Sequence, residues 1–121
     1  MTKFSDRIKK SAKTSPIILA NDYDPKIPNI ESKTLRNIKL LNNYLCGIKI
    51  NFHLLLQLDK KQISRINKNA HNYGLQCIAD IKLNDIGNTN FITAENLWNM
   101  GFDAVIVNPI MGKKSLKNLV E

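Results

Sequence analysis

Four short apolar runs recur along the chain at nearly even spacing, and each is followed by a segment with helical periodicity. The runs are residues 16–22 (PIILAND), 46–52 (CGIKINF), 75–83 (LQCIADIKL) and 103–108 (DAVIVN). Such alternation is typical of successive βα units. Because a crossover through a helix is right-handed, the four strands are expected to lie parallel in their order of occurrence.

The segments between the runs predict helices. Residues 31–45 place Leu35, Ile38, Leu41 and Leu45 near one helix face. In residues 59–74, Asp59 is the expected N-cap, Gly74 lies just past the end, and the apolar stripe is Ile63, Ile66 and Ala70. Residues 88–101 predict a third helix with Phe91, Ala94 and Trp98 on one face, and residues 113–121 begin a fourth.

The fold class is therefore α/β, either a small open sheet or part of a (β/α)8 TIM barrel. At 121 residues the chain is long enough for one small domain. We expect residues 1–14 to be an N-terminal basic helical segment, with Phe4 and Ile8 packing against the closed end of the sheet. Residues 15–121 would then cover strands 1–4 of a barrel with their helices, its N-terminal half.

Composition argues against several classes of protein. The net charge is +8, but the lysines are scattered without interleaved aromatic residues, so no nucleic-acid partner is expected. No apolar run approaches the roughly 18 residues of a membrane span. The N-terminus has no apolar region typical of a signal peptide, which predicts a cytoplasmic protein. The spacings of Cys46, Cys77, His53 and His71 match no zinc pattern, so we expect buried free thiols and no metal.

The most informative stretch is IADIKLNDIGNTN, residues 78–90, which places Asp80, Lys82 and Asp85 within six positions of one another. Side chains alternate along a strand, so Asp80 and Lys82 share one face. The same parity turns Lys49 inward on the second strand, and Asp22 lies at the C-terminal edge of the first. In barrels the active site forms at these strand ends. Four charged residues are thus expected at one mouth, where a cationic lysine between carboxylates can deliver a proton to a carbanion.

These residues also carry a family resemblance. ADIKLNDIGNTN resembles the D-x-K-x-x-D-I signature of orotidine 5'-phosphate decarboxylase, IILAND and GIKIN resemble the first two strands of that family, and GFDAVIVNPIMGKKSL resembles its fourth strand and loop. The resemblance runs in order from about residue 15 to the end. It implies a cofactor-free decarboxylation of orotidine 5'-monophosphate to uridine 5'-monophosphate in de novo pyrimidine synthesis.

The resemblance also implies roles for individual residues. Lys82 would protonate C6 as carbon dioxide leaves, with Asp80 beside the substrate carboxylate. Lys49 would hold Asp80 and contact the ribose, and Asp22 would accept a ribose hydroxyl. In the family, the equivalent of Asp85 reaches a neighbouring subunit's site, together with those of Ile86 and Thr89. A homodimer with shared active sites, or a complementary C-terminal half, is the partner implied.

Three alternatives stand beside this hypothesis. Magnesium-dependent sugar-phosphate decarboxylases and aldolases of the same superfamily share the third-strand pattern, but they carry a metal-binding glutamate on the second strand where this chain has Lys49. A noncatalytic half-barrel serving in assembly has no need of Asp80 and Asp85 around Lys82. A flavodoxin-like or dinucleotide-binding domain lacks its phosphate loop here.

The family's contacts to the pyrimidine ring and the phosphate come from strands five to eight, which the chain does not contain. Binding energy from a remote phosphate raises the rate at the reacting centre. The chain alone is therefore expected to be at best weakly active, as a truncated piece or as one half that needs a complementary half.

Overall fold

A computed structural model of the chain describes residues 2–120, and it contains a four-stranded parallel sheet in the order β1-β2-β3-β4. The strands are β1 (Ile18–Asn21), β2 (Gly47–Asn51), β3 (Gln76–Leu83) and β4 (Ala104–Val107). Each of the four expected strands is present, and the parallel sequential order confirms the βα repeat. Strands β1 and β4 are the two edges of the sheet.

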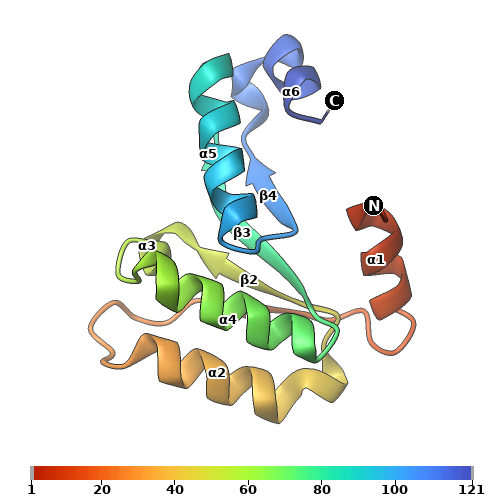
Figure 1. Cartoon of the computed structure of the whole chain (residues 1–121), viewed down its shortest axis with the longest axis vertical. Coiled ribbons are helices and arrows are strands. Elements are labelled where there is room, and N and C mark those ends of the chain that lie inside the picture. The colour runs from red at the N-terminus through yellow and green to blue at the C-terminus, as the bar shows by residue number, and fades with distance from the viewer. Residues whose placement is uncertain (1, 121) are drawn as a thin grey trace.

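Helices follow every strand (Figure 1). The α-helices are α1 (Phe4–Ser11), α2 (Ile30–Leu41), α3 (Phe52–Leu55), α4 (Lys60–Asn72), α5 (Gly87–Asn99) and α6 (Lys113–Val120). Short 3-10 turns, η1 (Asn42–Tyr44) and η2 (Pro109–Met111), follow α2 and β4. The helix expected over residues 31–45 thus ends earlier as an α-helix, and Leu45 is buried just beyond η1.

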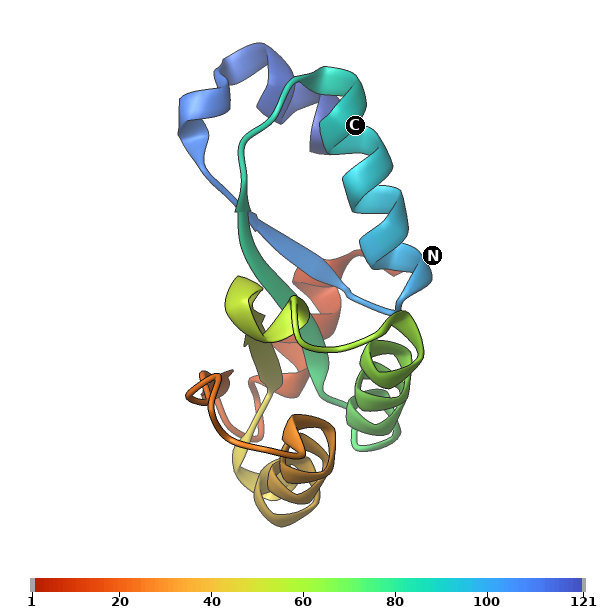
Figure 2. The same cartoon turned by 90° about the vertical axis from the view of Figure 1, so that its left-hand side faces the viewer.

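The core lies between the sheet and the helices on its outer face. Figure 2 shows α4 and α5 on the same side of β3. Side chains of β2 and β3 that point outward, among them Ile48, Ile50 and Cys77, pack with Ile38 and Ile66 of the helices. The free thiols of Cys46 and Cys77 are both buried, as expected. The polar side chains of β2 and β3 therefore belong to the opposite, inner face.

Helix α4 begins and ends where its sequence predicts. The carboxylate of Asp59 accepts a hydrogen bond from Gln62 N, and the Gln62 side chain accepts one from Asp59 N, which completes a capping box. Gly74 follows the helix with a φ of 75°, a conformation that favours glycine. The predicted stripe of Ile63, Ile66 and Ala70 is buried. Local chemistry alone is enough to place this helix.

The buried face of α5 differs from the prediction. Ala94 is buried, but Phe91 and Trp98 are 58% and 43% exposed. The face that meets the sheet is Asn90, Ala94 and Leu97. The prediction failed because it assigned the core positions to large apolar residues, whereas a hydrogen-bonded asparagine occupies one of them.

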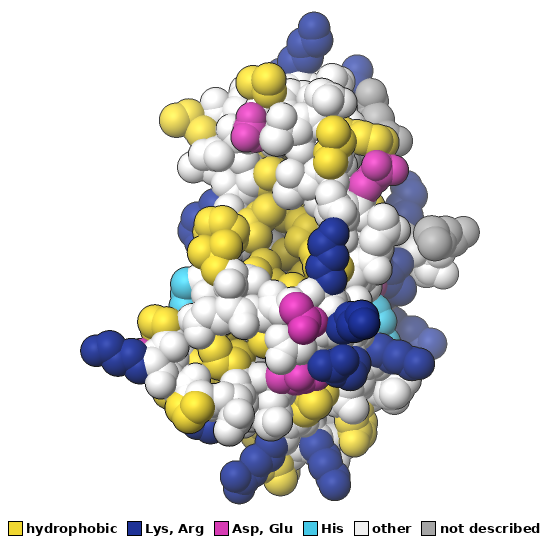
Figure 3. Space-filling view, turned by 60° about the vertical axis from the view of Figure 1, so that its left-hand side comes forward, with side chains coloured by type: hydrophobic (Ala, Val, Ile, Leu, Met, Phe, Trp, Pro, Cys, Tyr) yellow, Lys and Arg dark blue, Asp and Glu magenta, His cyan; other side chains and the backbone are white. Residues whose placement is uncertain are grey.

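An apolar groove of about 330 Å³ separates α5 from α3 and the start of α4. Phe52, Leu56, Ile81, Leu97 and Met100 are among its lining residues. Figure 3 shows apolar side chains around a hollow on this side of the molecule, with acidic and basic side chains nearby. No helix within residues 2–120 has both the length and the hydropathy that crossing a bilayer requires.

The start of β2 depends on the absence of a side chain at Gly47. A Cβ atom there would lie 2.8 Å from the backbone carbonyl oxygen of Gln76 on β3. We expect Gly47→Ala to lower the free energy of unfolding by about 1–3 kcal/mol, because the clash is with backbone that cannot rotate away. Urea unfolding followed by circular dichroism measures it. Gly87→Ala is the matched control, since nothing lies within 4 Å of a Cβ at Gly87; equal losses in both variants would contradict the close approach.

Candidate active site

Lys49 is the centre of a charged cluster at the C-terminal ends of β1, β2 and β3. Its Nζ lies 2.9 Å from Oδ2 of Asp80 and 3.6 Å from Oδ1 of Asp22. The Nζ of Lys82 lies 2.9 Å from the other carboxylate oxygen of Asp80. Strand parity and register explain the meeting, because Ile48 and Ile50 point into the core while Asn51 of β2 pairs with Asp80 of β3. The four predicted residues are therefore brought together.

Asn51 also belongs to this cluster, and the sequence analysis missed it. Its side-chain oxygen accepts a hydrogen bond from the Lys49 ammonium group. The signal was available, because Asn51 lies two positions after Lys49 on β2 and must share its face. With Asn51, Asp80 and Asp22 around it, the Lys49 ammonium group is held in one place.

Asp80 is buried, and its carboxylate lies between two cations. Burial alone would raise the pKa of Asp80, but the hydrogen bonds and positive charges of Lys82 and Lys49 outweigh it and hold this pKa below its usual range. Asp80 is thus an anion at neutral pH. The arrangement offers one buried carboxylate and, beside it, the ammonium group of Lys82, whose side chain is 66% exposed and accessible to a ligand.

Lys82 reaches this position through an unusual backbone. Its φ is 48°, in the left-handed region that non-glycine residues rarely adopt. The pairing of β3 with β4 is irregular at the same place, since Ala79 pairs with Val105 and Leu83 with Val107. A bulge of this kind changes the direction of a side chain and is common next to active sites. Residues held in such sparsely populated conformations cluster at active sites and ligand-binding sites.

Lys82→Gly and Lys82→Ala separate the backbone cost from the ion pair. Both variants remove the ammonium group, but only glycine relieves the left-handed conformation. We expect the Gly variant to be more stable than the Ala variant by about 1 kcal/mol, with the comparison made by thermal or urea unfolding. An Ala variant as stable as the Gly variant would mean that the backbone at residue 82 is not strained.

Asp85, Ile86 and Thr89 lie apart from the charged cluster, on the loop after β3 and the first turn of α5. All three are exposed. The Asp85 carboxylate accepts a hydrogen bond from the backbone of Ile86, and within residues 2–120 no hydrogen bond or ion pair joins it to Lys82. In this chain, therefore, the acceptor oxygens beside Lys82 belong to Asp80, and Asp85 faces outward.

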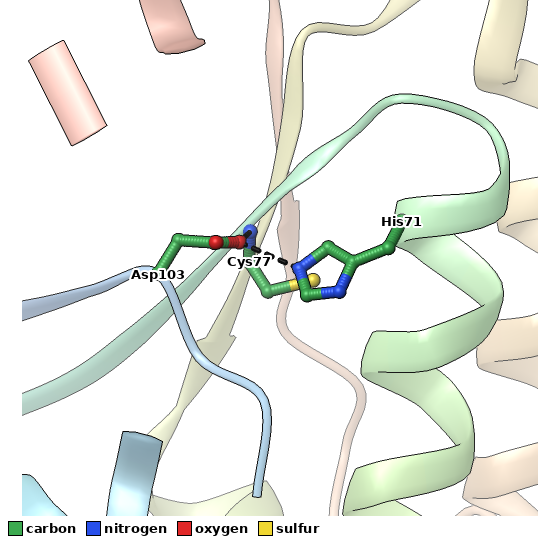
Figure 4. A group of neighbouring side chains, drawn as sticks. All are labelled: His71, Cys77 and Asp103. Carbon is green, nitrogen blue, oxygen red and sulfur yellow. Dashed lines mark hydrogen bonds and ion pairs between the residues drawn. The ribbon is translucent and has the colours of Figure 1, made fainter. Parts of the chain in front are cut away.

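A second cluster lies at the opposite, N-terminal end of the sheet, where His71, Cys77 and Asp103 offer ligand atoms within 4.8 Å of one another (Figure 4). Asp103 Oδ2 accepts hydrogen bonds of 2.8 Å from His71 Nε2 and from the backbone of Cys77. Its Oδ1 accepts one of 2.9 Å from Arg7 of α1, whose guanidinium group also donates to Gln76.

These hydrogen bonds argue for a structural role and against a metal site. Both oxygens of Asp103 are already occupied, one of them by a cation, and burial raises the pKa of the Cys77 thiol, which disfavours the thiolate that a metal would need. The cluster instead joins α1, α4 and the starts of β3 and β4. In barrels the N-terminal end of the sheet usually contributes to stability, and the active site lies at the C-terminal end.

The pH dependence of stability tests the Asp103 cluster. Burial would raise the pKa of Asp103, but hydrogen bonds from His71 and Cys77 N, with the charges of His71 and Arg7, hold this pKa below its usual value. The stabilisation is therefore complete above about pH 4 and is lost as the pH falls through the folded-state pKa. We expect Asp103→Asn to lower the free energy of unfolding at pH 7 by about 1–3 kcal/mol, with the difference shrinking below pH 4.

Urea unfolding at a series of pH values measures this difference. Asp6→Asn is the control for loss of a carboxylate, since Asp6 is an exposed residue of α1. A loss for Asp103→Asn that is no larger than the control's, or that does not change with pH, would contradict the assignment.

Comparison with known proteins identifies the family. The model of the orotidine 5'-phosphate decarboxylase / HUMPS family matches residues 15–121. Orotidine 5'-phosphate decarboxylase of Pyrococcus abyssi is 34% identical over 106 residues, covering 87% of this chain and 47% of that protein. The enzyme of the same name from Thermococcus kodakarensis is 32% identical over 108 residues, covering 88% of this chain and 46% of that protein. The chain thus spans about half the length of these curated relatives.

Solved structures agree. The crystal structure of orotidine 5'-phosphate decarboxylase from Pyrococcus horikoshii matches with a TM-score of 0.69 at 28% identity, over 86% of this chain and 47% of that chain. The crystal structure of a candidate orotidine-monophosphate decarboxylase from Toxoplasma gondii matches with a TM-score of 0.84, over 98% of this chain and 44% of that chain. At 18% identity, this match shows the fold alone. The four βα units correspond to the N-terminal half of a TIM barrel, and the chain belongs to the orotidine 5'-phosphate decarboxylase / HUMPS family.

Proposed function

We propose that the chain is the N-terminal half of a cofactor-free orotidine 5'-phosphate decarboxylase, which converts orotidine 5'-monophosphate to uridine 5'-monophosphate in de novo pyrimidine synthesis. Residues 15–121 form the decarboxylase half, and residues 1–14 are an appended basic segment. The observation that carries the proposal is the array of Lys49, Asp80 and Lys82 at the strand ends. It supplies the charges that this reaction needs in a chain that belongs to the family.

In the proposed mechanism the bond between C6 and the carboxylate carbon breaks, and its electron pair stays on C6 as carbon dioxide leaves. Lys82 donates a proton from its ammonium group to C6. Its side chain is more exposed than those of Lys49 and Asp80, so a substrate can contact it. Asp80 stays anionic beside it and stabilises the ammonium form. Repulsion between Asp80 and the substrate carboxylate is relieved as the carboxylate departs.

Lys49 and Asp22 bind the ribose in this proposal. Lys49 has an exposed fraction of 19% and is fixed by Asp80 and Asn51, so it fills a positioning role as well as a binding one. The Asp22 carboxylate is 42% exposed at the end of β1, where it can accept a hydrogen bond from a ribose hydroxyl group. Both residues use groups that already point to the inner face.

The rest of the site is supplied from outside residues 1–121. A complementary C-terminal half supplies the pyrimidine and phosphate contacts, and a homodimer shares Asp85, Ile86 and Thr89 between neighbouring sites. The exposure of these three residues supports the sharing. Two buried free cysteines are consistent with the reducing cytoplasm, where we place the enzyme.

The magnesium-dependent alternative is disfavoured by Lys49. In that mechanism the second strand supplies a carboxylate to the metal, whereas the Lys49 ammonium group lies 2.9 Å from the Asp80 oxygen that would be a ligand. A cation at this distance opposes a second cation. The noncatalytic alternative leaves the strained Lys82 without a purpose, because an assembly surface has no use for it.

Decarboxylation of orotidine 5'-monophosphate, followed by the loss of its ultraviolet absorbance, tests the proposal. The chain is assayed alone and after addition of strands five to eight from a related enzyme. We expect little or no turnover alone, because the phosphate contacts are missing, and turnover when the halves are combined. Lys82→Ala is expected to reduce that turnover by at least about 100-fold, since it removes the proton donor.

Lys68→Ala is the matched control, because Lys68 is an exposed lysine of α4 away from the strand ends. Turnover that survives Lys82→Ala as well as it survives Lys68→Ala would exclude the proposed mechanism. Halves that associate, as judged by sedimentation, yet do not decarboxylate the substrate would favour the noncatalytic assembly protein.

A further inference from the structure

Asn90 is a buried residue of α5 that grips the backbone of Asp85 from both sides. It is 1% exposed. Its side-chain oxygen accepts a hydrogen bond of 2.9 Å from Asp85 N, and its side-chain nitrogen donates one of 2.5 Å to Asp85 O. Its own backbone N–H donates to Ile86 O at 3.0 Å. Three hydrogen bonds from one residue therefore fix the turn between β3 and α5.

The hydrogen bonds from Asn90 follow directly after the last hydrogen bond between β3 and the chain that continues from β4. The last hydrogen bond that β3 receives from its neighbour runs from Asn108 N to Leu83 O at 2.9 Å. Two residues later, the amide group of Asn90 presents a carbonyl oxygen and an N–H to Asp85, as a neighbouring strand would. A primary amide at this chain length offers both groups on separate atoms, whereas an ionised aspartate has no donor.

Asn90 lies on the buried face of α5, where a polar side chain loses its hydration on folding. Ala94 and Leu97 occupy the same buried face of α5, so an apolar residue at position 90 would pack there and lose no hydration. The helix does not need Asn90 for its own N-cap, which is Ile86. What the asparagine adds is a fixed conformation for the outward-facing residues Asp85, Ile86 and Thr89.

We propose that Asn90 is a positioning residue that presents Asp85, and with it Ile86 and Thr89, to the active site of a neighbouring subunit. The proposal rests on the proposed function for the role of Asp85, but the grip itself is a property of this chain. An open pocket of about 430 Å³, with Asn84, Asp85, Ile86 and Met111 among its lining residues, lies next to the turn, so the described part of this chain does not fill the space there.

Hydrogen exchange of the Asp85 amide, measured by NMR on the 121-residue chain, tests the grip without any activity. We expect Asn90→Ala to lower the protection of this amide at least about tenfold, because its acceptor is removed. Asn90→Asp keeps an acceptor for Asp85 N but replaces the donor to Asp85 O with a second oxygen. We expect it to lower the protection as well, by less than Asn90→Ala, and it provides a second variant if Asn90→Ala does not fold. Protection of Asp85 that is unchanged in Asn90→Ala would overturn the grip.

Asn67→Ala is the matched control for loss of a buried amide. Asn67 lies fully buried on α4, and its side chain donates to Met100 O at 2.9 Å, away from the turn. It should destabilise the chain without a selective loss at Asp85. Equal losses of Asp85 protection in Asn67→Ala and Asn90→Ala would mean that Asn90 contributes only to general stability, and would overturn the proposal.

A double-mutant cycle with Asp85→Asn tests the positioning role in the combined halves. If Asn90 acts through Asp85, Asn90→Ala lowers kcat about tenfold or more when Asp85 is present and has little effect in the Asp85→Asn background. A reduction by the same factor in both backgrounds would show a merely structural role and overturn the proposal. Absence of turnover in every form would count against the proposed function, and the exchange measurement would then decide the grip by itself.

Discussion

The ion pair between Lys49 and Asp80 depends on the register of two parallel strands, and the rest of the site depends on that pair. Asn51 pairs with Asp80 across β2 and β3, so Lys49, two residues earlier, lies on the same face within 2.9 Å of the carboxylate. A shift of one residue would turn Lys49 into the core and Ile48 or Ile50 out of it. The burial of Ile48 and Ile50 on one face and the Lys49–Asp80 ion pair on the other therefore require the same register.

The two ends of the sheet differ in how their charged groups are paired and exposed. At the N-terminal end, Asp103 has its oxygens fully engaged with His71, Arg7 and the backbone of Cys77, which leaves nothing for a ligand. At the C-terminal end, the polar groups are drawn together around Asp80, and the Lys82 side chain remains exposed. Hydrogen-bonded closure at one end supports an open, charged arrangement at the other.

Sequence patterns predicted the strands, helix α4 and the meeting of Asp22, Lys49, Asp80 and Lys82, because these follow from periods of two and 3.6 residues and from capping chemistry. They did not predict the buried face of α5. Hydrophobicity selected Phe91 and Trp98, whereas the tertiary structure places Asn90 inside, where its polarity is compensated by the backbone of Asp85. The left-handed conformation of Lys82 could not be predicted either, since it accompanies an irregular pairing with β4 that no sequence period reveals.

The position of Cys77 gives the fold a built-in chemical reporter. Its side chain is buried near the N-terminal end of β3 with no exposed surface, and burial raises the pKa of the thiol, so reagents that attack thiolates cannot reach it in the closed sheet. Modification then requires β3 to separate from the helices that cover it. The labelling rate of this sulfur would count such openings, and its slowing on addition of a second half would report assembly of the barrel without any substrate.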